Sequence, residues 1–386
     1  MNFDLDDTQI ALRGAAQDFA RSALAPHAAQ WDAEAIFPRE VIGQAGELGF
    51  CGLYTPEAYG GLGLARLDSA MIFEALAGGC TSTAAYISIH NMATWMIAAF
   101  GGDAVRETWC GELAAGEKLA SYCLTEPGAG SDAGSLKTRA VADGDDYVLD
   151  GSKCFISGAG DTDVLVVMAR TGDAGPSGIS TFVVPADAPG ISYGRKEPKM
   201  GWNSQATRTI TFEGVRVAAT NRLGDEGQGF SIAMKGLDGG RINIAACSLG
   251  TAQAALDAAR RYMSERRQFG RPLAEFQALQ FKLADMATEL IAARQMVWLA
   301  ATRLDQGHDE ATTFCAMAKR LATDQCFDIC NAALQIHGGY GYIREYPLER
   351  HVRDVRVHQI LEGTNEIMRL IIARRVLADD NGDNLR

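Results

Sequence analysis

One carboxylate stands out by its neighbours, because residues 360–366 read Ile-Leu-Glu-Gly-Thr-Asn-Glu ahead of an amphipathic segment. Thr364 or Asn365 suits the N-cap of that helix, and Glu366 suits its first turn. Capping does not explain Glu362. Its apolar neighbours indicate a partly desolvated carboxyl group, and desolvation raises a carboxyl pKa and strengthens the group as a base. From the residues alone, a functional base and an ordinary structural carboxylate are equally good interpretations of Glu362.

A glycine-rich stretch at residues 122–132 could hold a ligand, because it reads Tyr-Cys-Leu-Thr-Glu-Pro-Gly-Ala-Gly-Ser-Asp. Glycines allow close approach of the backbone, and exposed N–H groups can form an anion site. The pattern is neither Gly-x-Gly-x-x-Gly nor a phosphate-binding loop that ends in Gly-Lys-Ser/Thr. A plain tight turn and a cofactor loop are both compatible with it.

Two further stretches follow long helical patterns. Residues 335–342 read Gln-Ile-His-Gly-Gly-Tyr-Gly-Tyr, and glycines in this position are typical of a helix C-cap. His337 is a candidate base, although a lone histidine at a helix end is more often structural. Residues 265–272 are rich in arginine and form either a solvated loop or a phosphate contact. No Gly-x-Ser-x-Gly is present, so a serine hydrolase is not indicated.

The composition of the chain limits the kinds of partner that it can bind and indicates its cellular compartment. The 386 residues carry 36 Lys and Arg against 48 Asp and Glu, a formal net charge of −12. This balance disfavours nucleic acid, because a phosphate backbone needs a broad basic face. No apolar run approaches the roughly 20 residues that span a bilayer, so no membrane association is expected. The N-terminal residues resemble neither a secretory signal nor a transit peptide. We therefore expect a cytoplasmic location in a bacterial-type chain, or the mitochondrial matrix for a processed eukaryotic form.

The nine cysteines are odd in number and form no Cys-x-x-Cys pair, so we expect no disulfide framework and a reducing compartment. Cys326 and Cys330 stand four residues apart on a helical pattern, with His337 beyond them. A metal site is the minor alternative there, and buried reduced thiols are the main interpretation. We predict no bound metal.

Three stretches with different patterning position these residues. Five of the ten prolines fall between residues 127 and 198, among short runs of alternating β-branched and polar residues, which predicts an antiparallel sheet or barrel of short strands. The flanking pattern is helical. Residues 279–304 repeat apolar side chains at steps of four and three, an a/d repeat that predicts a helix bundle. The expected helices cover residues 6–24, 40–48, 66–78, 84–100, 245–265, 279–304 and 311–335.

In this order and separation, the four motifs resemble the acyl-CoA dehydrogenase family. They are the stretch at 122–132, Arg-Arg-Gln-Phe-Gly at 266–270, Gln-Ile-His-Gly-Gly-Tyr-Gly at 335–341 and Leu-Glu-Gly-Thr-Asn-Glu-Ile at 361–367. Residues 56–61 fit the N-terminal domain of the family, and the resemblance covers roughly residues 5–380. It implies an N-terminal helical domain at 1–120, a middle β-barrel or sheet domain at 121–232 and a C-terminal four-helix bundle at 233–386.

The resemblance implies an FAD-dependent enzyme in which Glu362 is the catalytic base. Some relatives carry the base at the position of Gly240, which leaves Glu362 as the one candidate here. Many relatives have Trp where this chain has Phe155, which keeps a stacking surface without the indole N–H. The implied FAD contacts are Tyr122, Leu124, Thr125, Gly130, Ser131, Phe155, Ile156, Ser157, Arg266, Gln268, Phe269, Phe276, Gln277, Gln335, Ile336, His337, Gly338, Gly339, Thr364, Asn365 and Glu366. The implied substrate contacts are Ser131, Asp238, Arg241, Gly363 and Arg374.

The resemblance also implies partners and a reaction. In the family, residues at the positions of 266–277 and 335–339 reach FAD from a neighbouring subunit, so we expect a homo-oligomer, a dimer of dimers. Electron-transfer flavoprotein is the implied electron acceptor. The motifs are closest to those of members that oxidise isobutyryl-CoA, while butyryl-, 2-methylbutyryl- and propionyl-CoA stay open. An acyl-CoA oxidase or flavin monooxygenase on the same fold is one alternative, and a non-catalytic scaffold or acyl-CoA-binding protein is another.

Overall fold

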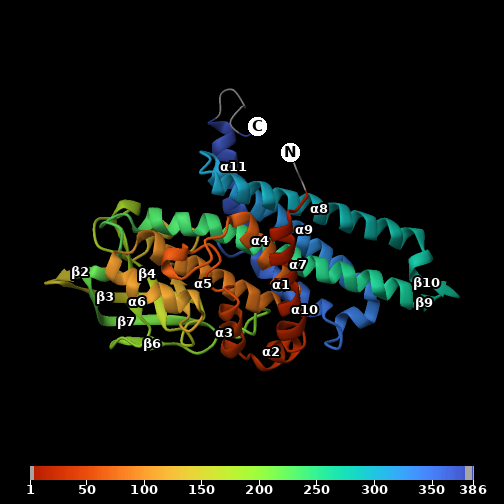
Figure 1. Ribbon diagram of the computed structural model, residues 1–386, viewed down its shortest axis with the longest axis horizontal. Helices are drawn as coiled ribbons and strands as arrows, with labels where there is room; N and C mark the ends of the chain where they lie inside the picture. The colour runs from red at the N-terminus through yellow and green to blue at the C-terminus, as the bar shows by residue number, and fades with distance from the viewer. Residues whose placement is uncertain (1–3, 379–384, 386) are drawn as a thin grey trace.

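The computed structural model describes residues 4–378 and 385. The chain runs from helices through a sheet and back into helices, so the predicted class, mainly α with a central β domain, is confirmed (Figure 1). Among the helices of the described chain, none combines the length and apolarity that crossing a membrane requires. The N-terminal region contains α1 (Asp7–Phe19), α2 (Ala28–Glu34), α3 (Arg39–Glu47), α4 (Arg66–Ala77), α5 (Thr81–Phe100) and α6 (Asp103–Ala114).

Two of these helices differ from their predicted bounds by more than one residue. The helix expected over 6–24 ends as α1 at Phe19, and the chain continues as a π-helical turn, Ala20–Leu24. Helix α5 begins at Thr81 and not at residue 84. Its first residues are polar yet buried, and Thr81 is hydrogen-bonded to Thr251 at 2.8 Å between hydroxyl oxygens. Apolar periodicity misses such a start, because a satisfied hydroxyl can enter the core.

The middle region is a sheet whose strands lie in the order β6-β7-β3-β2-β4-β5-β8, with β1 also paired to β4. The predicted antiparallel pairing holds for most neighbours, but β1 and β4 are parallel, as are β2 and β4 at one residue pair. The β2–β3 hairpin lies between β1 and β4 in the sequence, and β3 runs opposite to β1, so the chain returns to the end of the sheet where β1 begins and β4 can run parallel to β1. The strands are β1 (Ala120–Cys123), β2 (Arg139–Asp143), β3 (Asp146–Ser157), β4 (Val164–Arg170), β5 (Ile179–Pro185), β6 (Ile191–Tyr193), β7 (Thr207–Ala218) and β8 (Arg222–Leu223).

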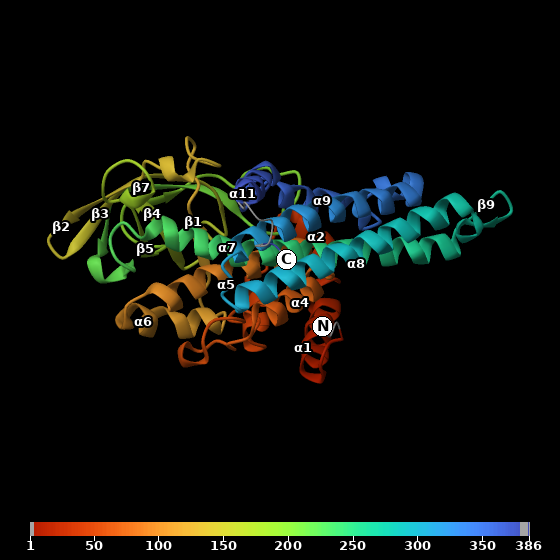
Figure 2. The same cartoon turned by 90° about the horizontal axis from the view of Figure 1, so that it is seen from above.

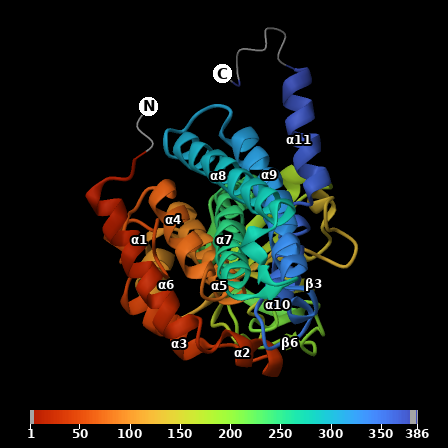
Figure 3. The same ribbon diagram turned by 90° about the vertical axis from the view of Figure 1, so that its right-hand side faces the viewer.

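The C-terminal region is a bundle of long helices that extends away from the sheet (Figure 2). The heptad repeat predicted over 279–304 forms the buried face of α8, where Met286, Leu290 and Val297 lie in the core. Viewed along the bundle, α7, α8, α9 and α10 pack side by side (Figure 3). Its elements are α7 (Gly229–Glu265), β9 (Arg267–Gln268), β10 (Arg271–Pro272), α8 (Gln277–Asp305), α9 (Ala311–His337), α10 (Leu348–Arg356) and α11 (Asn365–Leu377).

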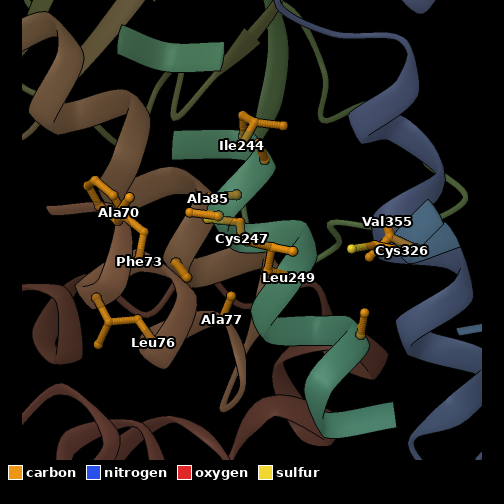
Figure 4. Close-up of a cluster of buried hydrophobic side chains, with 14 of the residues drawn as sticks. Ala70, Phe73, Leu76, Ala77, Ala85, Ile244, Cys247, Leu249, Cys326 and Val355 are labelled. Carbon is orange, nitrogen blue, oxygen red and sulfur yellow. The ribbon is translucent and has the colours of Figure 1, made fainter. Parts of the chain in front are cut away.

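Helix α7 ties the regions together, because α4 of the N-terminal region packs against it in one continuous core. The two predicted domain boundaries remain proposals. The boundary at 120/121 lies at the start of β1, which begins at Ala120, and the boundary at 232/233 lies at the first turn of α7. The two helices approach closely at Gly250, where a Cβ atom would overlap the carbonyl oxygen of Glu74. Figure 4 shows Ala70, Phe73, Leu76 and Ala77 of α4 facing Ile244, Cys247 and Leu249 of α7.

This contact predicts that Gly250→Ala destabilises the fold by about 1–3 kcal/mol, because the added methyl group meets rigid backbone. Gly111, on the exposed side of α6, is the matched control, since a Cβ there has no atom within 4 Å. Gly111→Ala should be neutral or stabilising by up to about 1 kcal/mol. Urea unfolding of the two variants measures the difference. Equal midpoints would contradict the packing described for α4 and α7.

Candidate active site

Glu362 lies on a tight turn between a 3-10 turn (Val357–Gln359) and α11. Its φ angle is 55°, in the left-handed region, and the φ angle of Gly363 is 92°. A non-glycine residue in this conformation is strained by about 1–3 kcal/mol and is kept there by its surroundings. Thr364 caps α11, and its hydroxyl accepts a hydrogen bond from the backbone N–H of Ile367 at 3.3 Å. The turn therefore fixes the direction in which Glu362 projects.

The Glu362 carboxylate meets the middle of α7. A Cβ atom on Gly240 would lie 2.5 Å from Glu362 Oε2 and 2.9 Å from the sulfur atom of Met92. The glycine therefore makes room for the carboxylate, and this contact agrees with the expectation that Gly240 carries no alternative base. Glu362 Oε2 is buried and has no hydrogen-bond partner among the described residues. An unpartnered buried carboxylate oxygen is costly, so it marks a position where a ligand can supply the missing contact.

Burial raises the pKa of Glu362 to about 7, while the positive charges of Lys319 and Arg241 oppose this shift. The pKa therefore lies near neutrality, where a general base works best because it is partly ionised yet retains proton affinity. Geometry supports the same conclusion, since Oε2 is not engaged elsewhere. The carboxylate can accept a proton at this position.

Arg241 and Asp238, both on α7, lie near Glu362. The Arg241 Nη1 atom is 2.6 Å from Asp238 Oδ1, and Arg241 Nε donates to the backbone oxygen of Glu362 at 3.3 Å. Asp238 also accepts from the hydroxyl of Thr312 at 2.7 Å, and burial raises its pKa. The structure thus brings two predicted substrate contacts to the candidate base.

The other predicted substrate contacts lie differently. Gly363 is next to Glu362, and a Cβ atom on it would be 2.6 Å from the terminal methyl carbon of Met368. Ser131 is exposed in the glycine-rich loop, and Arg374 is exposed on the last turn of α11. Their roles remain predictions.

A buried ion pair anchors the glycine-rich loop to the sheet. Lys153 Nζ lies 2.7 Å from Glu126 Oε1 and donates to the carbonyl oxygen of Leu124 at 3.1 Å, and its side chain is fully buried. The backbone N–H of Cys154 donates to the carbonyl oxygen of Thr125 at 2.9 Å. These bonds hold the two predicted flavin segments, 122–131 and 155–157, side by side.

The anchored segments offer a surface that fits a flat ring. Phe155 sits at an irregularity in the pairing of β3 with β7, with a φ angle of 57°, and 69% of the residue is exposed. Cβ atoms on Gly128 or Gly130 would meet no atom within 4 Å. An exposed aromatic face beside an open glycine loop suits stacking and close backbone approach. The residues present therefore fit an isoalloxazine ring, although the individual contacts of Tyr122, Thr125, Ile156 and Ser157 remain predictions.

The second predicted flavin group lies at the opposite end of the molecule, at the tip of the bundle, away from the sheet (Figures 1 and 2). A pocket of about 440 Å³ is lined there by Arg266, Gln268, Ile336, His337, Gly338 and Gly339, among others. Phe269 in this group is 92% exposed, and Phe276 and Gln277 mark the start of α8. The bundle tip and the sheet thus lie apart in one chain (Figure 2).

His337 is held by contacts within the described chain, and its role as a flavin contact remains a prediction. Its Nδ1–H donates to the carbonyl oxygen of Ala333 at 2.8 Å, and its ring stacks on Tyr262 with centroids 4.2 Å apart. Burial lowers the pKa of His337. Cys326 and Cys330 are buried free thiols, and no group of three or more His, Cys, Asp or Glu side chains among the described residues could hold a metal ion.

Sequence reasoning missed Lys319, whose Nζ donates to the carbonyl oxygen of Gly363 and to Asn365 Oδ1, both at 2.8 Å. A signal was present: Cys315, Lys319, Ala322 and Cys326 follow the 4-3-4 spacing of a buried helix face, so the lysine had to enter the core. Asn365 is itself buried, with its side chain amide bonded inside the protein. A flavin contact at Asn365 would therefore use its backbone, and the contacts expected of Thr364 and Glu366 remain predictions.

The raised pKa of Glu362 predicts a stability change. In the folded state the carboxyl stays protonated up to about pH 7, whereas an unfolded glutamate ionises near 4.5. Folding stability is therefore present below the unfolded pKa and falls as pH rises through the folded one, by a total on the order of 3 kcal/mol. Glu362→Gln has no ionisable group, so its stability relative to the parent should increase from acid to mildly alkaline pH.

Urea unfolding across this pH range measures the effect. Glu40→Gln, at an exposed carboxylate in the first turn of α3, serves as control and should show no such pH-dependent gain. A constant difference between Glu362→Gln and the parent would rule out a desolvated Glu362.

Comparisons with known proteins agree with this geometry. Family models match in sequence order: the acyl-CoA dehydrogenase N-terminal domain at residues 6–117, middle domain at 121–215 and C-terminal domain at 227–377. The chain is 55% identical to mitochondrial isobutyryl-CoA dehydrogenase of Bos taurus, over 97% of this chain and 90% of that protein. It is 43% identical to the mitochondrial short-chain specific acyl-CoA dehydrogenase of the same organism, over 97% and 91%.

A solved structure extends the likeness to three dimensions. Butyryl-CoA dehydrogenase from Megasphaera elsdenii superposes with a TM-score of 0.95 at 41% identity, covering 98% of this chain and 100% of that one. Three family domains in order, high identity over nearly the whole chain and a matching fold lead to one conclusion. The chain belongs to the acyl-CoA dehydrogenase family and is an FAD-dependent oxidoreductase.

Proposed function

We propose that the protein removes hydrogen from Cα and Cβ of a short, branched acyl-CoA, converting isobutyryl-CoA into methacrylyl-CoA. The observation that carries this proposal is the buried, unpartnered Oε2 atom of Glu362, on a carboxyl group whose pKa lies near neutrality. The identity with isobutyryl-CoA dehydrogenase supports the branched short-chain substrate. Butyryl-, 2-methylbutyryl- and propionyl-CoA remain the alternatives, because one methylene changes pocket affinity by only about 1–3 kcal/mol.

In the proposed reaction, Glu362 accepts the proton from Cα, and the electron pair of that C–H bond forms the Cα–Cβ double bond. FAD, when bound, would supply at N5 the acceptor for the hydride that leaves Cβ. The Cα proton is weakly acidic, so its removal needs a positioned base and a stabilised thioester oxygen. The backbone N–H of Glu362 serves that oxygen, since the left-handed turn fixes the peptide as well as the side chain.

Arg241 and Asp238 complete the substrate side of the site. Their ion pair lies beside the Glu362 backbone and contributes a local cation and a carboxylate to a thioester ligand. A local cation at Arg241 or at the exposed Arg374 would explain how a chain with a net charge of −12 accepts a ligand that carries phosphate groups. A few fixed arginines suffice, whereas a long polyanion would need a broad basic surface.

FAD is proposed to lie between two chains. Phe155 and the loop that carries Thr125 would hold the isoalloxazine ring, while Arg266, Gln268 and the loop at 335–339 would come from a neighbouring subunit. The separation of these two groups in one chain supports this arrangement (Figure 2), as does the pocket at the bundle tip. A homotetramer, built as a dimer of dimers, satisfies it, with electron-transfer flavoprotein as the electron acceptor.

Mixing the flavin-loaded protein with isobutyryl-CoA without oxygen should bleach the flavin, and Glu362→Gln should keep its flavin but bleach at least about 1,000-fold more slowly. A glutamine has nearly the same shape, so the loss would reflect proton abstraction. Stopped-flow absorbance measures both rates. Glu40→Gln is the control and should bleach at the parental rate; a near-normal rate for Glu362→Gln would refute its role as base.

The same assay separates the alternatives. A panel of propionyl-, butyryl-, isobutyryl- and 2-methylbutyryl-CoA ranks the acyl chains, and faster bleaching by butyryl-CoA would favour a straight-chain enzyme. Prompt peroxide formation in air, in place of electron transfer to electron-transfer flavoprotein, would identify an acyl-CoA oxidase. A preparation that acquires no flavin spectrum with added FAD would leave only a binding protein.

A further inference from the structure

Lys319 is a fully buried lysine on α9, in a stretch rich in alanine. Burying an ammonium group is costly unless its donors are satisfied. Two of them are, by the carbonyl oxygen of Gly363 and by Asn365 Oδ1. Both acceptors are neutral, and among the described residues no carboxylate lies within ion-pair distance of Nζ. The lysine therefore brings an uncompensated positive charge to this part of the core.

The two acceptors belong to the turn that carries Glu362. Gly363 is the next residue, and Asn365 is the first residue of α11. Asn365 is bonded in turn to α9, because its Nδ2 atom donates to Thr323 Oγ1 at 2.9 Å and to an Asp324 carboxylate oxygen at 2.6 Å. A strained left-handed residue needs such fixed surroundings to persist. These bonds supply that support.

Building on the proposed function, we propose that Lys319 is a positioning residue that fixes the Glu362 turn and whose charge makes the Glu362 carboxylate easier to ionise for proton abstraction. Two cations oppose the effect of burial on the pKa of Glu362, and Lys319 is the larger influence. Arg241 is the smaller one, and its charge is already paired with Asp238 at 2.6 Å. The charge of Lys319 has no such partner, so it acts mainly on Glu362.

The other charged and titratable groups around the pair do not change this balance. Tyr54, Tyr122 and Cys247 face Glu362, and burial raises their pKa values, so they are neutral near pH 7. Burial lowers the pKa of Lys319 to about 8, which leaves it charged at neutrality. The groups that act on Glu362 or Lys319 from the surrounding elements are Tyr54, Tyr122, Asp238, Arg241, Cys247, Asp324, His358 and Glu366.

The sign of the expected effect follows from the charge. Glu362 must be deprotonated to take the Cα proton, so the bleaching rate rises with pH through the pKa of Glu362. Removing a nearby positive charge makes the carboxylate harder to ionise and moves this rise to higher pH. A neighbouring charge can shift a carboxyl pKa by about 1–3 units. A residue that acts only on structure would lower the rate at every pH without moving the midpoint.

The test compares Lys319→Met, Lys319→Gln and Lys319→Arg in the flavin-loaded protein. Lys235→Met is the control, since Lys235 is an exposed lysine of α7. The pH dependence of bleaching by isobutyryl-CoA is measured by stopped flow. The midpoint should rise by about one unit or more in the uncharged variants, stay at the parental value in Lys235→Met and return toward it in Lys319→Arg. An unmoved midpoint in either uncharged variant overturns the proposal.

A second readout does not depend on turnover. Infrared difference spectra recorded over the same pH range, with Glu362→Gln as the subtraction background, report the ionisation of Glu362 itself. The carboxyl band should persist to higher pH in Lys319→Gln than in the parent, and identical titrations overturn the proposal. If isobutyryl-CoA does not bleach the parent protein, the proposed function fails while this titration still decides the role of Lys319. If neither uncharged variant folds, Lys319→Arg decides, because it keeps the positive charge and should keep the parental midpoint. A midpoint shift of a full unit in Lys319→Arg would then overturn the proposal.

Discussion

The cost of burying one carboxylate organises the centre of this molecule. Glu362 Oε2 lies against α7 without a hydrogen-bond partner among the described residues, and a carboxylate desolvated in this way resists ionisation. The surroundings only partly offset that cost. Gly240 supplies space, Arg241 and Lys319 supply positive charge, and the left-handed turn fixes the direction of the side chain. The result is a group with a proton affinity suited to neutral pH, which a fully solvated or fully paired glutamate would not have.

The sheet also contains a buried carboxylate, but there the carboxylate is fully paired. Lys153 and Glu126 form a buried pair in which the carboxylate accepts further bonds from the backbone N–H groups of Lys137 and Thr138 at 2.6 and 2.9 Å. The charges are satisfied, so they fix geometry and are not available for chemistry. They hold a loop open beside Phe155. One buried carboxylate keeps an oxygen without a hydrogen-bond partner among the described residues, and the other is used as an anchor.

Much of this arrangement could be predicted from the sequence where the signal was periodic or was carried by a motif. The repeat over 279–304 predicted the buried face of α8, because heptad spacing requires a partner seam. The order of four motifs predicted the family, and through it Glu362. Residues without a periodic signature were harder. The start of α5 at Thr81 is polar, and the parallel pairing of β1 with β4 depends on how the intervening hairpin folds.

The supporting charges were the least predictable part. In the sequence, Lys319 resembles any lysine of a helix, and only the spacing of the buried face of α9 indicates that it is buried. The two atoms that accept its hydrogen bonds belong to residues 44 and 46 positions further along the chain. Lys153 similarly lies 27 residues from Glu126. Contacts of this kind depend on how α9, the turn at 360–365 and β3 pack, which local pattern does not specify. The proposed role of Lys319 therefore depends on contacts that only the folded chain brings together.

The central claim is that a carboxylate in the space beside Gly240 takes the proton. Glu362→Gly removes the carboxylate at a position whose φ angle of 55° suits glycine, so the turn should keep its shape and leave that space open. The decisive measurement is the rate of flavin bleaching by isobutyryl-CoA in this variant with increasing formate, using chloride at equal ionic strength as the control. The account predicts a slow variant that formate accelerates in a saturable manner and chloride does not. A Glu362→Gly protein that bleaches at the parental rate without formate would contradict it.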